Sequence, residues 1–182
     1  MPFISIEGID GSGKTEQVKL LVEHLRGNGQ SVLQTKEPDG GHLGAEVRAI
    51  LTHSDRPLAP AEQLLLVSAA RFDHVRSVIR PALASGQWVI SDRFIDSTYA
   101  FQVAVSDADL HLDLPLAVAH GRREQRRDGV PDPAEAARDF AVIRKALIAV
   151  AHQEPERCHV IDANQSLDGV ARDIWRLVEP LL

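Results

Sequence analysis

The sequence predicts an α/β fold in which a parallel sheet of five strands is covered by helices on both faces. Two observations indicate this fold. Short apolar runs alternate with helical stretches along the whole chain, and these runs have nearly continuous apolar faces, as is typical of parallel strands buried on both sides. The length of 182 residues suits a single domain over residues 1–182, because a chain of this size can bury a sizeable core.

Five segments read as strands: residues 3–7, 31–35, 87–91, 110–114 and 159–162. The first predicted helix covers residues 14–26, where apolar side chains recur on one helical face. The other helices are expected at residues 43–51, 59–70, 73–84, 96–105, 116–127, 133–151 and 166–178. Pro81 could kink the helix that contains it, and Ser166 is well placed to cap the last helix.

Several polar side chains are expected at the end of a predicted strand or just after one. These side chains are Glu37, Asp92, Arg93 and Asp113, and the glycine-rich turn at residues 8–13 likewise follows a strand. Because ligands of open parallel sheets bind at the carboxyl ends of the strands, we expect these groups to gather on one rim. Asp113 could equally cap the following helix, and Glu37 could mark only a turn.

The segment from Gly8 to Thr15 fits the phosphate-loop pattern G-x-x-x-x-G-K-[ST] without a gap. Its glycines let successive backbone N–H groups point at phosphate oxygens, and the helix that follows adds the positive end of its dipole. Lys14 would reach the outer phosphates and the Thr15 hydroxyl would bind Mg²⁺. The expected nucleotide-binding residues are Gly8, Gly11, Ser12, Gly13, Lys14 and Thr15.

The overall charge and the cysteine content narrow the class of protein. A formal net charge of −6 argues against tight non-specific binding to nucleic acid, but it does not exclude a small phosphate ligand. The single cysteine, Cys158, cannot form an intramolecular disulfide, which fits a reducing compartment. The sequence contains no signal-peptide pattern and no long apolar run, so we expect a cytoplasmic protein that does not bind a membrane.

Further motifs occur in a fixed order along the chain. Together with the phosphate loop, residues 36–38, 79–83, 88–94 and 160–166 resemble the bacterial thymidylate kinase family over nearly the whole length. The resemblance implies a three-layer P-loop kinase fold. It also implies transfer of a phosphoryl group from ATP, with Mg²⁺, to a nucleoside monophosphate, most simply dTMP to give dTDP.

The resemblance also implies roles for individual residues. Asp10 would contact the sugar hydroxyl of the acceptor and help to orient its phosphate, and Arg93 would bridge the two phosphates. Asp92 would hold Mg²⁺ through water, and Arg71 would hydrogen-bond the base. The other implied acceptor residues are Pro38, Val67, Ser97, Thr98, Phe101 and Gln102. Simple alternatives are a surface ion pair for Asp92 and Arg93, and a solvated helix residue for Arg71.

A cluster of four arginines lies in a lid segment predicted near residues 121–133: Arg122, Arg123, Arg126 and Arg127. Gly11 stands where some members of the family carry an arginine, and the variant with glycine there supplies its arginine from the lid. Arg122 aligns best with that catalytic arginine, and Arg126 is the second candidate. The alternative is a solvated basic face of a helix.

Departures from the family pattern concentrate at the acceptor side. Val67 replaces the usual stacking phenylalanine, Phe101 replaces a common tyrosine, and Glu16 follows Thr15 in place of a small hydroxyl residue. The family also carries a helix between Gln102 and Leu110 that this shortened, divergent chain lacks. Two alternatives to dTMP kinase activity therefore stay open: a kinase for another or modified pyrimidine deoxynucleotide, and a degenerate nucleotide-binding paralogue without turnover.

A homodimer is expected, because the family pairs through helices that correspond to residues 59–84. The proposed contact surface contains Leu64, Leu65, Val67 and Ser68. The alternative is that these side chains belong to the ordinary core.

Overall fold

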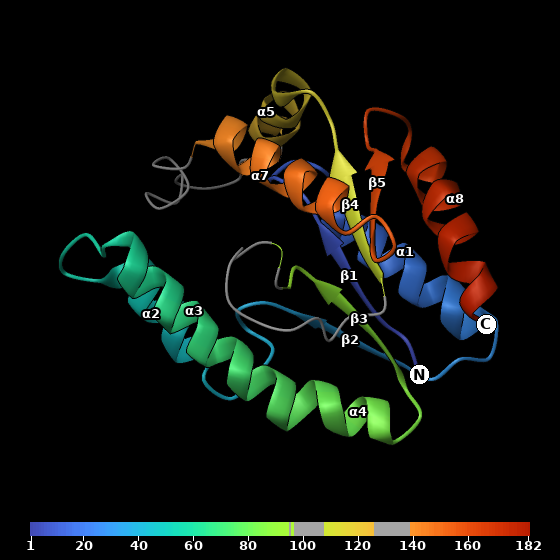
Figure 1. The fold of residues 1–182 in the computed structure, drawn as a ribbon, viewed down its shortest axis with the longest axis horizontal. Coiled ribbons are helices and arrows are strands. Elements are labelled where there is room, and N and C mark those ends of the chain that lie inside the picture. Colours follow the sequence, from blue (N-terminus) through green and yellow to red (C-terminus); the bar gives the residue numbers. More distant parts are fainter. Residues whose placement is uncertain (95, 97–107, 126–138) are drawn as a thin grey trace.

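The structure is a computed structural model that describes residues 1–94, 96, 108–125 and 139–182 (Figure 1). Its centre is a five-stranded sheet with the order β2-β3-β1-β4-β5, in which every neighbouring pair is parallel. The strands are β1 (Phe3–Glu7), β2 (Val32–Lys36), β3 (Trp88–Asp92), β4 (Ala108–Asp113) and β5 (Cys158–Asp162). The predicted α/β fold is therefore confirmed, and all five predicted strands are found with ends shifted by at most about two residues.

One face of the sheet is apolar and carries the main core. The helices α1 (Lys14–Gly27) and α8 (Leu167–Val178) pack side by side on this face, and Figure 1 shows both beside the strands. The strand side chains of this apolar face are Ile4, Ile6, Trp88, Ile90, Leu110, Leu112 and Ile161. Ser166 caps α8 as predicted, since its Oγ accepts a hydrogen bond of 3.1 Å from the N–H of Gly169.

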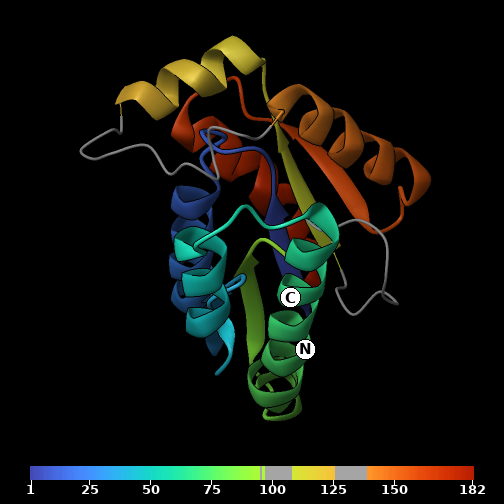
Figure 2. The ribbon, with the colours of Figure 1, turned by 90° about the vertical axis from the view of Figure 1, so that its left-hand side faces the viewer.

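The opposite face is covered by one long helical run and by α7 (Phe140–Gln153), as Figure 2 shows for the run at residues 60–84. The run contains α3 (Pro60–His74), the π-helical turn η1 (Val75–Ile79) and α4 (Arg80–Ala84). The two separate helices predicted at 59–70 and 73–84 are thus continuous. The irregularity is a π turn in which the Arg80 N–H reaches back to the Val75 carbonyl. Pro81 follows at once, and because proline lacks an N–H and its ring crowds the preceding turn, a widened turn suits this position.

This second face is unusual because much of it is polar and still buried. Its polar face consists of Ser5, Glu7, Ser91, Asp109 and His111, none of which is more than 2 % exposed. Strand side chains alternate between the two faces, so that Ser5 and Glu7 lie opposite Ile4 and Ile6. At the amino ends of the strands the same face becomes apolar, where Phe3 and Val89 pack with Ile79, Ala82 and Phe94.

Among the described residues, the remaining helices are α2 (Gly44–His53), α5 (Leu116–Gln125) and the 3₁₀ turn η3 (Glu179–Leu181). The part of the helix predicted at 133–151 that lies within the described residues is found as α7 (Phe140–Gln153), and residues 133–138 lie outside them. Asp139 Oδ1 accepts hydrogen bonds from the N–H groups of Ala141 and Val142, at 3.0 and 3.1 Å, and so caps α7. The predicted helix at 96–105, the family helix that we expect to be missing after Gln102, and most of the predicted lid fall outside the described residues. Within the described part of the chain, no helix is both long and apolar enough to cross a membrane.

Candidate active site

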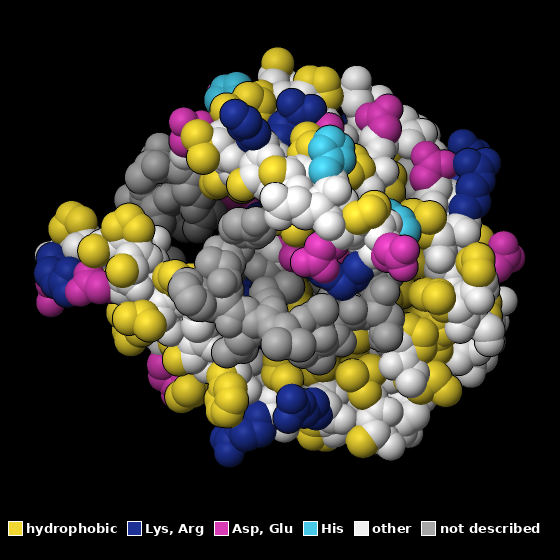
Figure 3. Space-filling model, viewed as in Figure 1, with side chains coloured by type: hydrophobic (Ala, Val, Ile, Leu, Met, Phe, Trp, Pro, Cys, Tyr) yellow, Lys and Arg dark blue, Asp and Glu magenta, His cyan; other side chains and the backbone are white. Residues whose placement is uncertain are grey.

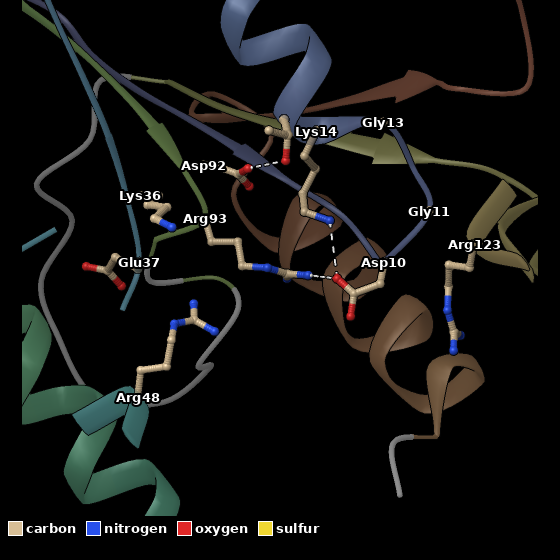
Figure 4. A pocket seen from close by; sticks show the side chains of 11 residues that line it. Asp10, Gly11, Gly13, Lys14, Lys36, Glu37, Arg48, Asp92, Arg93 and Arg123 are labelled. Atoms are coloured by element: carbon tan, nitrogen blue, oxygen red, sulfur yellow. Dashed lines mark hydrogen bonds and ion pairs between the residues drawn. The ribbon is translucent and has the colours of Figure 1, made fainter. Parts of the chain in front are cut away.

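A cavity of about 380 Å³ lies at the carboxyl ends of β1, β2 and β3 (Figure 4). Its lining comes from the turn after β1, the start of α1, the ends of β2 and β3, α2 and α5. The lining residues are Asp10, Gly11, Gly13, Lys14, Thr15, Lys36, Glu37, Arg48, Asp92, Arg93 and Arg123. The turn at residues 8–13, Glu37, Asp92 and Arg93 meet here as predicted from the topology.

The turn after β1 has a backbone that requires glycine. Gly8, Gly11 and Gly13 have φ angles of +141°, +90° and +94°, in the region that side chains rarely enter. At Gly11 an added Cβ would also lie 2.4 Å from the Ala119 carbonyl oxygen of α5. Gly13 precedes α1 and has no side chain with which to cap it, which leaves the first N–H groups of α1 directed at the cavity edge.

Lys14 is 6 % exposed, and its ammonium lies in the cavity. The Nζ atom donates a hydrogen bond of 2.9 Å to the Ile9 carbonyl and lies 3.7 Å from Asp10 Oδ1. Burial, together with the positive charge of Arg93, lowers the pKa of Lys14 from 10.5 to about 8. A lysine whose charged form is poorly solvated would gain strongly from an anionic ligand such as a phosphate.

Arg93 reaches across the cavity to Asp10. Its Nη2 lies 2.5 Å from Asp10 Oδ1, and Figure 4 shows Lys14 and Arg93 converging on this carboxylate. The backbone of Arg93 has a φ of +73°, a left-handed conformation that costs a non-glycine residue about 1 kcal/mol or more. A hydrogen bond of 3.1 Å from the Arg93 N–H to the Ile6 carbonyl stabilises this turn, which directs the guanidinium into the cavity.

Thr15 and Asp92 form a pair of oxygen ligands at the start of α1 and the end of β3. The Thr15 hydroxyl donates a hydrogen bond of 2.7 Å to Asp92 Oδ2. Mg²⁺ prefers oxygen ligands and commonly takes one or two protein groups together with substrate phosphates and water. These two residues therefore fit the donor set that Mg²⁺ requires.

The cavity concentrates positive charge in an acidic protein. Among the described residues that line it, five are lysine or arginine and three are aspartate or glutamate. The sequence did not mark Lys36 or Arg48 as site residues, and it marked Arg123 only as one of the four clustered arginines of the lid, behind Arg122 and Arg126. Lys36 could have been found from its place at the end of a strand, whereas no signal marks Arg48 in α2. Asp39 pairs with both Lys36, at 2.8 Å, and Arg48.

Arg122 and Arg123 on α5 point to different places. Arg122 donates hydrogen bonds to the carbonyl oxygens of Ala163, at 3.0 Å, and Gln165, at 3.4 Å, in the turn after β5. Arg123 lines the cavity, and its guanidinium carbon lies 4.4 Å from the centre of the Phe140 ring. Of the arginines predicted in the lid, Arg123 is thus the one that the described structure places at the cavity, and Arg126 lies outside the described residues.

Arg71 is buried beside the cavity and does not line it. Its Nε lies 2.6 Å from Glu37 Oε2, its Nη2 donates a hydrogen bond of 3.0 Å to the Phe94 carbonyl, and its guanidinium lies over the Phe94 ring. His74 Nδ1 lies 3.3 Å from the other oxygen of Glu37, Oε1, and His74 Nε2 forms a hydrogen bond of 2.7 Å with the Thr35 hydroxyl. Glu37, expected to mark at most a turn or a rim position, is instead the centre of a buried polar network.

The other predicted residues take varied positions. Pro38 lies in the loop before α2 and packs its carbonyl against Gly44, and Val67 is half-buried in α3. Asp113 does not reach the cavity and pairs through both oxygens with Arg144 of α7, at 2.6 and 2.8 Å. Glu16 pairs with Lys19 at 3.2 Å and does not line the cavity. Ser97, Thr98, Phe101 and Gln102 lie outside the described residues.

Comparisons with known proteins agree on one family. Residues 6–119 match the family thymidylate kinase. The chain is 40% identical to a thymidylate kinase of Thiobacillus denitrificans, with 98% of this chain and 97% of that one covered. It is also 40% identical to a thymidylate kinase of Syntrophotalea carbinolica, with 95% and 93% covered. The alignment with the Thiobacillus protein has 199 positions, more than this chain has residues, which agrees with a shortened member.

A solved structure gives the same result in three dimensions. The crystal structure of thymidylate kinase from Ehrlichia chaffeensis superposes with a TM-score of 0.74 at 28% identity, with 98% of each chain covered. The match in sequence runs over nearly the whole chain, and the match in structure includes the sheet that builds the cavity. This chain belongs to the thymidylate kinase family.

Proposed function

We propose that this protein transfers a phosphoryl group from ATP to thymidylate and so makes thymidine diphosphate. The observation that carries the proposal is the convergence of Lys14 and Arg93 on Asp10 in a cation-rich cavity, beside the Thr15 and Asp92 pair. Phosphoryl transfer needs little covalent chemistry from the protein and is accelerated mainly by positioning and by neutralisation of charge. The family membership supplies the substrate class.

The roles of the residues follow from their positions. Backbone N–H groups of Gly11, Gly13 and the start of α1 would hold the donor phosphates, and Lys14 would neutralise the outer ones. Arg93 would leave Asp10 in part to bridge donor and acceptor phosphates, while Asp10 orients the acceptor. Ser12 is buried in the same loop and is not among the residues that line the cavity.

Thr15 and Asp92 would hold Mg²⁺ together with the phosphates of the nucleotide. The bound ion would supply charge neutralisation at the phosphates as they react.

For the arginine of the lid, we propose Arg123 ahead of Arg122, because Arg123 lines the cavity while Arg122 is hydrogen-bonded to the turn after β5. This choice is tested by comparing Arg123→Ala with Arg122→Ala. We expect the larger loss of kcat for Arg123→Ala and a loss of stability for Arg122→Ala.

A coupled assay of ADP release against a panel of nucleoside monophosphates tests the activity directly. We expect turnover with dTMP above that with other acceptors. If turnover is faster with another pyrimidine deoxynucleotide, that nucleotide and not dTMP is the preferred acceptor. An absence of turnover with every acceptor, in protein that still binds ATP, would show a degenerate nucleotide-binding paralogue.

The acceptor side of the proposal is tested at Val67. An aromatic pair contributes about 0.5–1.5 kcal/mol beyond the burial of area, so a valine there should weaken dTMP binding by roughly twofold to tenfold. Restoring the ring with Val67→Phe should therefore tighten dTMP binding, measured by calorimetry, by a similar factor. Unchanged or weaker binding in a folded variant would mean that the pocket has been remodelled for a different base.

We further propose that two chains pair through the exposed side of α3. Its residues Ala61, Leu65, Ala69 and Phe72 recur at helical spacing, and Leu65 and Phe72 are 70% and 62% exposed. Leu64, Val67 and Ser68, expected on the contact surface, are half-buried in the chain itself. Light scattering should show a dimer, which Leu65→Glu converts to a monomer.

We also propose a cytoplasmic location, which the free thiol of Cys158 supports.

A further inference from the structure

Three side chains with metal-binding atoms meet on the polar face of the sheet, away from the cavity. They are Asp96, His111 of β4 and Cys158 at the start of β5, and all three are buried. The two strands are neighbours in the sheet, and Figure 1 shows them side by side. The ligand atoms Asp96 Oδ2, His111 Nε2 and Cys158 Sγ lie within 4.8 Å of one another.

Two of the three distances between the ligand atoms are near those of a tetrahedral site. Asp96 Oδ2 lies 2.8 Å from His111 Nε2 and 3.5 Å from Cys158 Sγ. Around a tetrahedral Zn²⁺, bonds of about 2.0 Å to oxygen and nitrogen and 2.3 Å to sulfur place neighbouring ligand atoms roughly 3.3–3.5 Å apart. Small side-chain adjustments would therefore bring all three atoms to bonding distance from one ion.

The surroundings of the three ligands favour a cation. Arg157 is a single guanidinium that pairs with the carboxylates of Asp96, at 3.4 Å, Glu154, at 3.1 Å, and Asp109. Asp96 and Asp109 are both buried, and a divalent cation would offset part of the cost of burying these carboxylates. Arg157 contacts Oδ1 of Asp96, whereas Oδ2 faces His111 and Cys158. Hydrogen bonds from outside a metal site commonly orient carboxylate ligands in this way.

We propose that Asp96, His111 and Cys158 form a structural site for one divalent transition metal ion of the zinc class. Thiolate and imidazole ligands select zinc over magnesium, which prefers oxygen. Binding replaces the hydrogen bonds that the Cys158 thiol and His111 Nε2 make to Asp96 by bonds to the metal. The thiol proton is released to solvent, the imidazole proton moves to Nδ1 of His111, and water completes the tetrahedron. Asp96 follows Arg93 by three residues in the sequence, and the ion would fasten Asp96 to β4 and β5.

A titration of the purified full chain with Co²⁺, in buffer that contains Mg²⁺, tests this site. Cys158 is the single cysteine of the chain, so a thiolate-to-cobalt charge-transfer band can arise from no other residue. We expect this band to saturate at one cobalt ion per chain and to disappear when Zn²⁺ is added. We also expect Zn²⁺ to raise the melting temperature, because the ion binds the folded state.

Variants separate the site from adventitious binding. Cys158→Ser should abolish the band and the stabilisation by Zn²⁺, and His111→Gln should weaken cobalt binding by about tenfold or more. His159→Gln is the matched control, because this neighbour in β5 is a histidine outside the cluster, and it should bind as the natural protein does. Absence of the band in the folded natural protein would overturn the proposal and leave only a hydrogen-bonded cluster. Equal stabilisation of Cys158→Ser by Zn²⁺ would show that the metal binds elsewhere.

Discussion

The two faces of the sheet differ in how they are filled and in what they contribute. The apolar face holds isoleucine, leucine and tryptophan side chains against α1 and α8. The polar face buries serine, glutamate, aspartate and histidine just as deeply. The apolar face stabilises the fold through burial, at about 25 cal/mol for each Å² removed from water. Burial of polar groups is costly unless each finds a partner, so the second face must contribute something other than burial.

The contribution of the polar face is position. Glu7 accepts a hydrogen bond of 2.6 Å from the Phe94 N–H, and Ser91 donates one of 2.7 Å to the Arg93 carbonyl. His111 holds Asp96 at 2.8 Å. These bonds fix the chain immediately after β3, where Arg93 turns into the cavity. On the face of the molecule drawn in Figure 3, positively and negatively charged side chains are scattered over the surface. The comparison teaches that one face provides stability and the other holds the reactive geometry.

The largest effect that separates the two roles is expected at the cavity. Lys14→Ala should lower kcat by about 100- to 1,000-fold or more, because the ammonium would contact the transferring phosphoryl group. The melting temperature should change little. Lys19→Ala, on the exposed side of the same helix, is the control and should keep full activity. A folded Lys14→Ala protein with unchanged kcat would refute the proposed kinase activity.

The next effect concerns the centre of the buried polar network. Glu37→Gln removes the carboxylate charge that faces the buried guanidinium of Arg71, and breaking such a buried ion pair costs about 3 kcal/mol of unfolding free energy. Urea denaturation measures this loss. Glu46→Gln on the exposed surface of α2 should change stability by less than about 0.5 kcal/mol. A loss no larger than this control would mean that the polar face does not depend on the pairing of Arg71.

The dependence of kcat/KM on pH tests the buried side of the cavity, because Lys14 is both buried and part of the cavity lining. With the pKa of Lys14 lowered to about 8, the free protein loses this charge as the pH rises through 8. We expect kcat/KM for ATP to fall by up to about tenfold per pH unit above that point. Between about pH 8 and 10.5 the unfolded chain keeps the proton that Lys14 of the folded chain has lost. The contribution of Lys14 to the free energy of unfolding therefore increases as the pH rises through this range. A kcat/KM that stays flat to pH 10 would contradict the lowered pKa.

The smallest effect is expected on the apolar face. Ile90→Val removes one methyl group from the core, which typically costs about 1 kcal/mol of unfolding free energy. Since the Ile90 side chain packs in the apolar core and does not line the cavity, kcat should stay the same once all the protein is folded. Urea denaturation and the coupled assay measure the two quantities on one preparation. A change in kcat beyond the folded fraction would show that the two faces do not act separately.

Much of the fold followed from the sequence because its signals are local. The strand at residues 3–7 and the glycine-rich turn after it are encoded within a dozen neighbouring residues, and both are found as predicted. The helix boundaries near Pro81 and Asp139 were less accurate. At Pro81 a π turn keeps the helical run continuous, and at Asp139 the side chain caps α7. These outcomes depend on which backbone hydrogen bonds the rest of the fold permits.

The sequence by itself determined the order of strands and helices, the phosphate loop and the family, because short-range spacing and ordered motifs specify them. Only the tertiary structure decided that Arg123 rather than Arg122 lines the cavity, since neighbours on a helix point about 100° apart and the packing of α5 selects between them. It also brought Arg48 to the cavity and assembled Asp96, His111 and Cys158 from distant segments. Such convergence depends on how whole elements pack, which no local pattern in the sequence records.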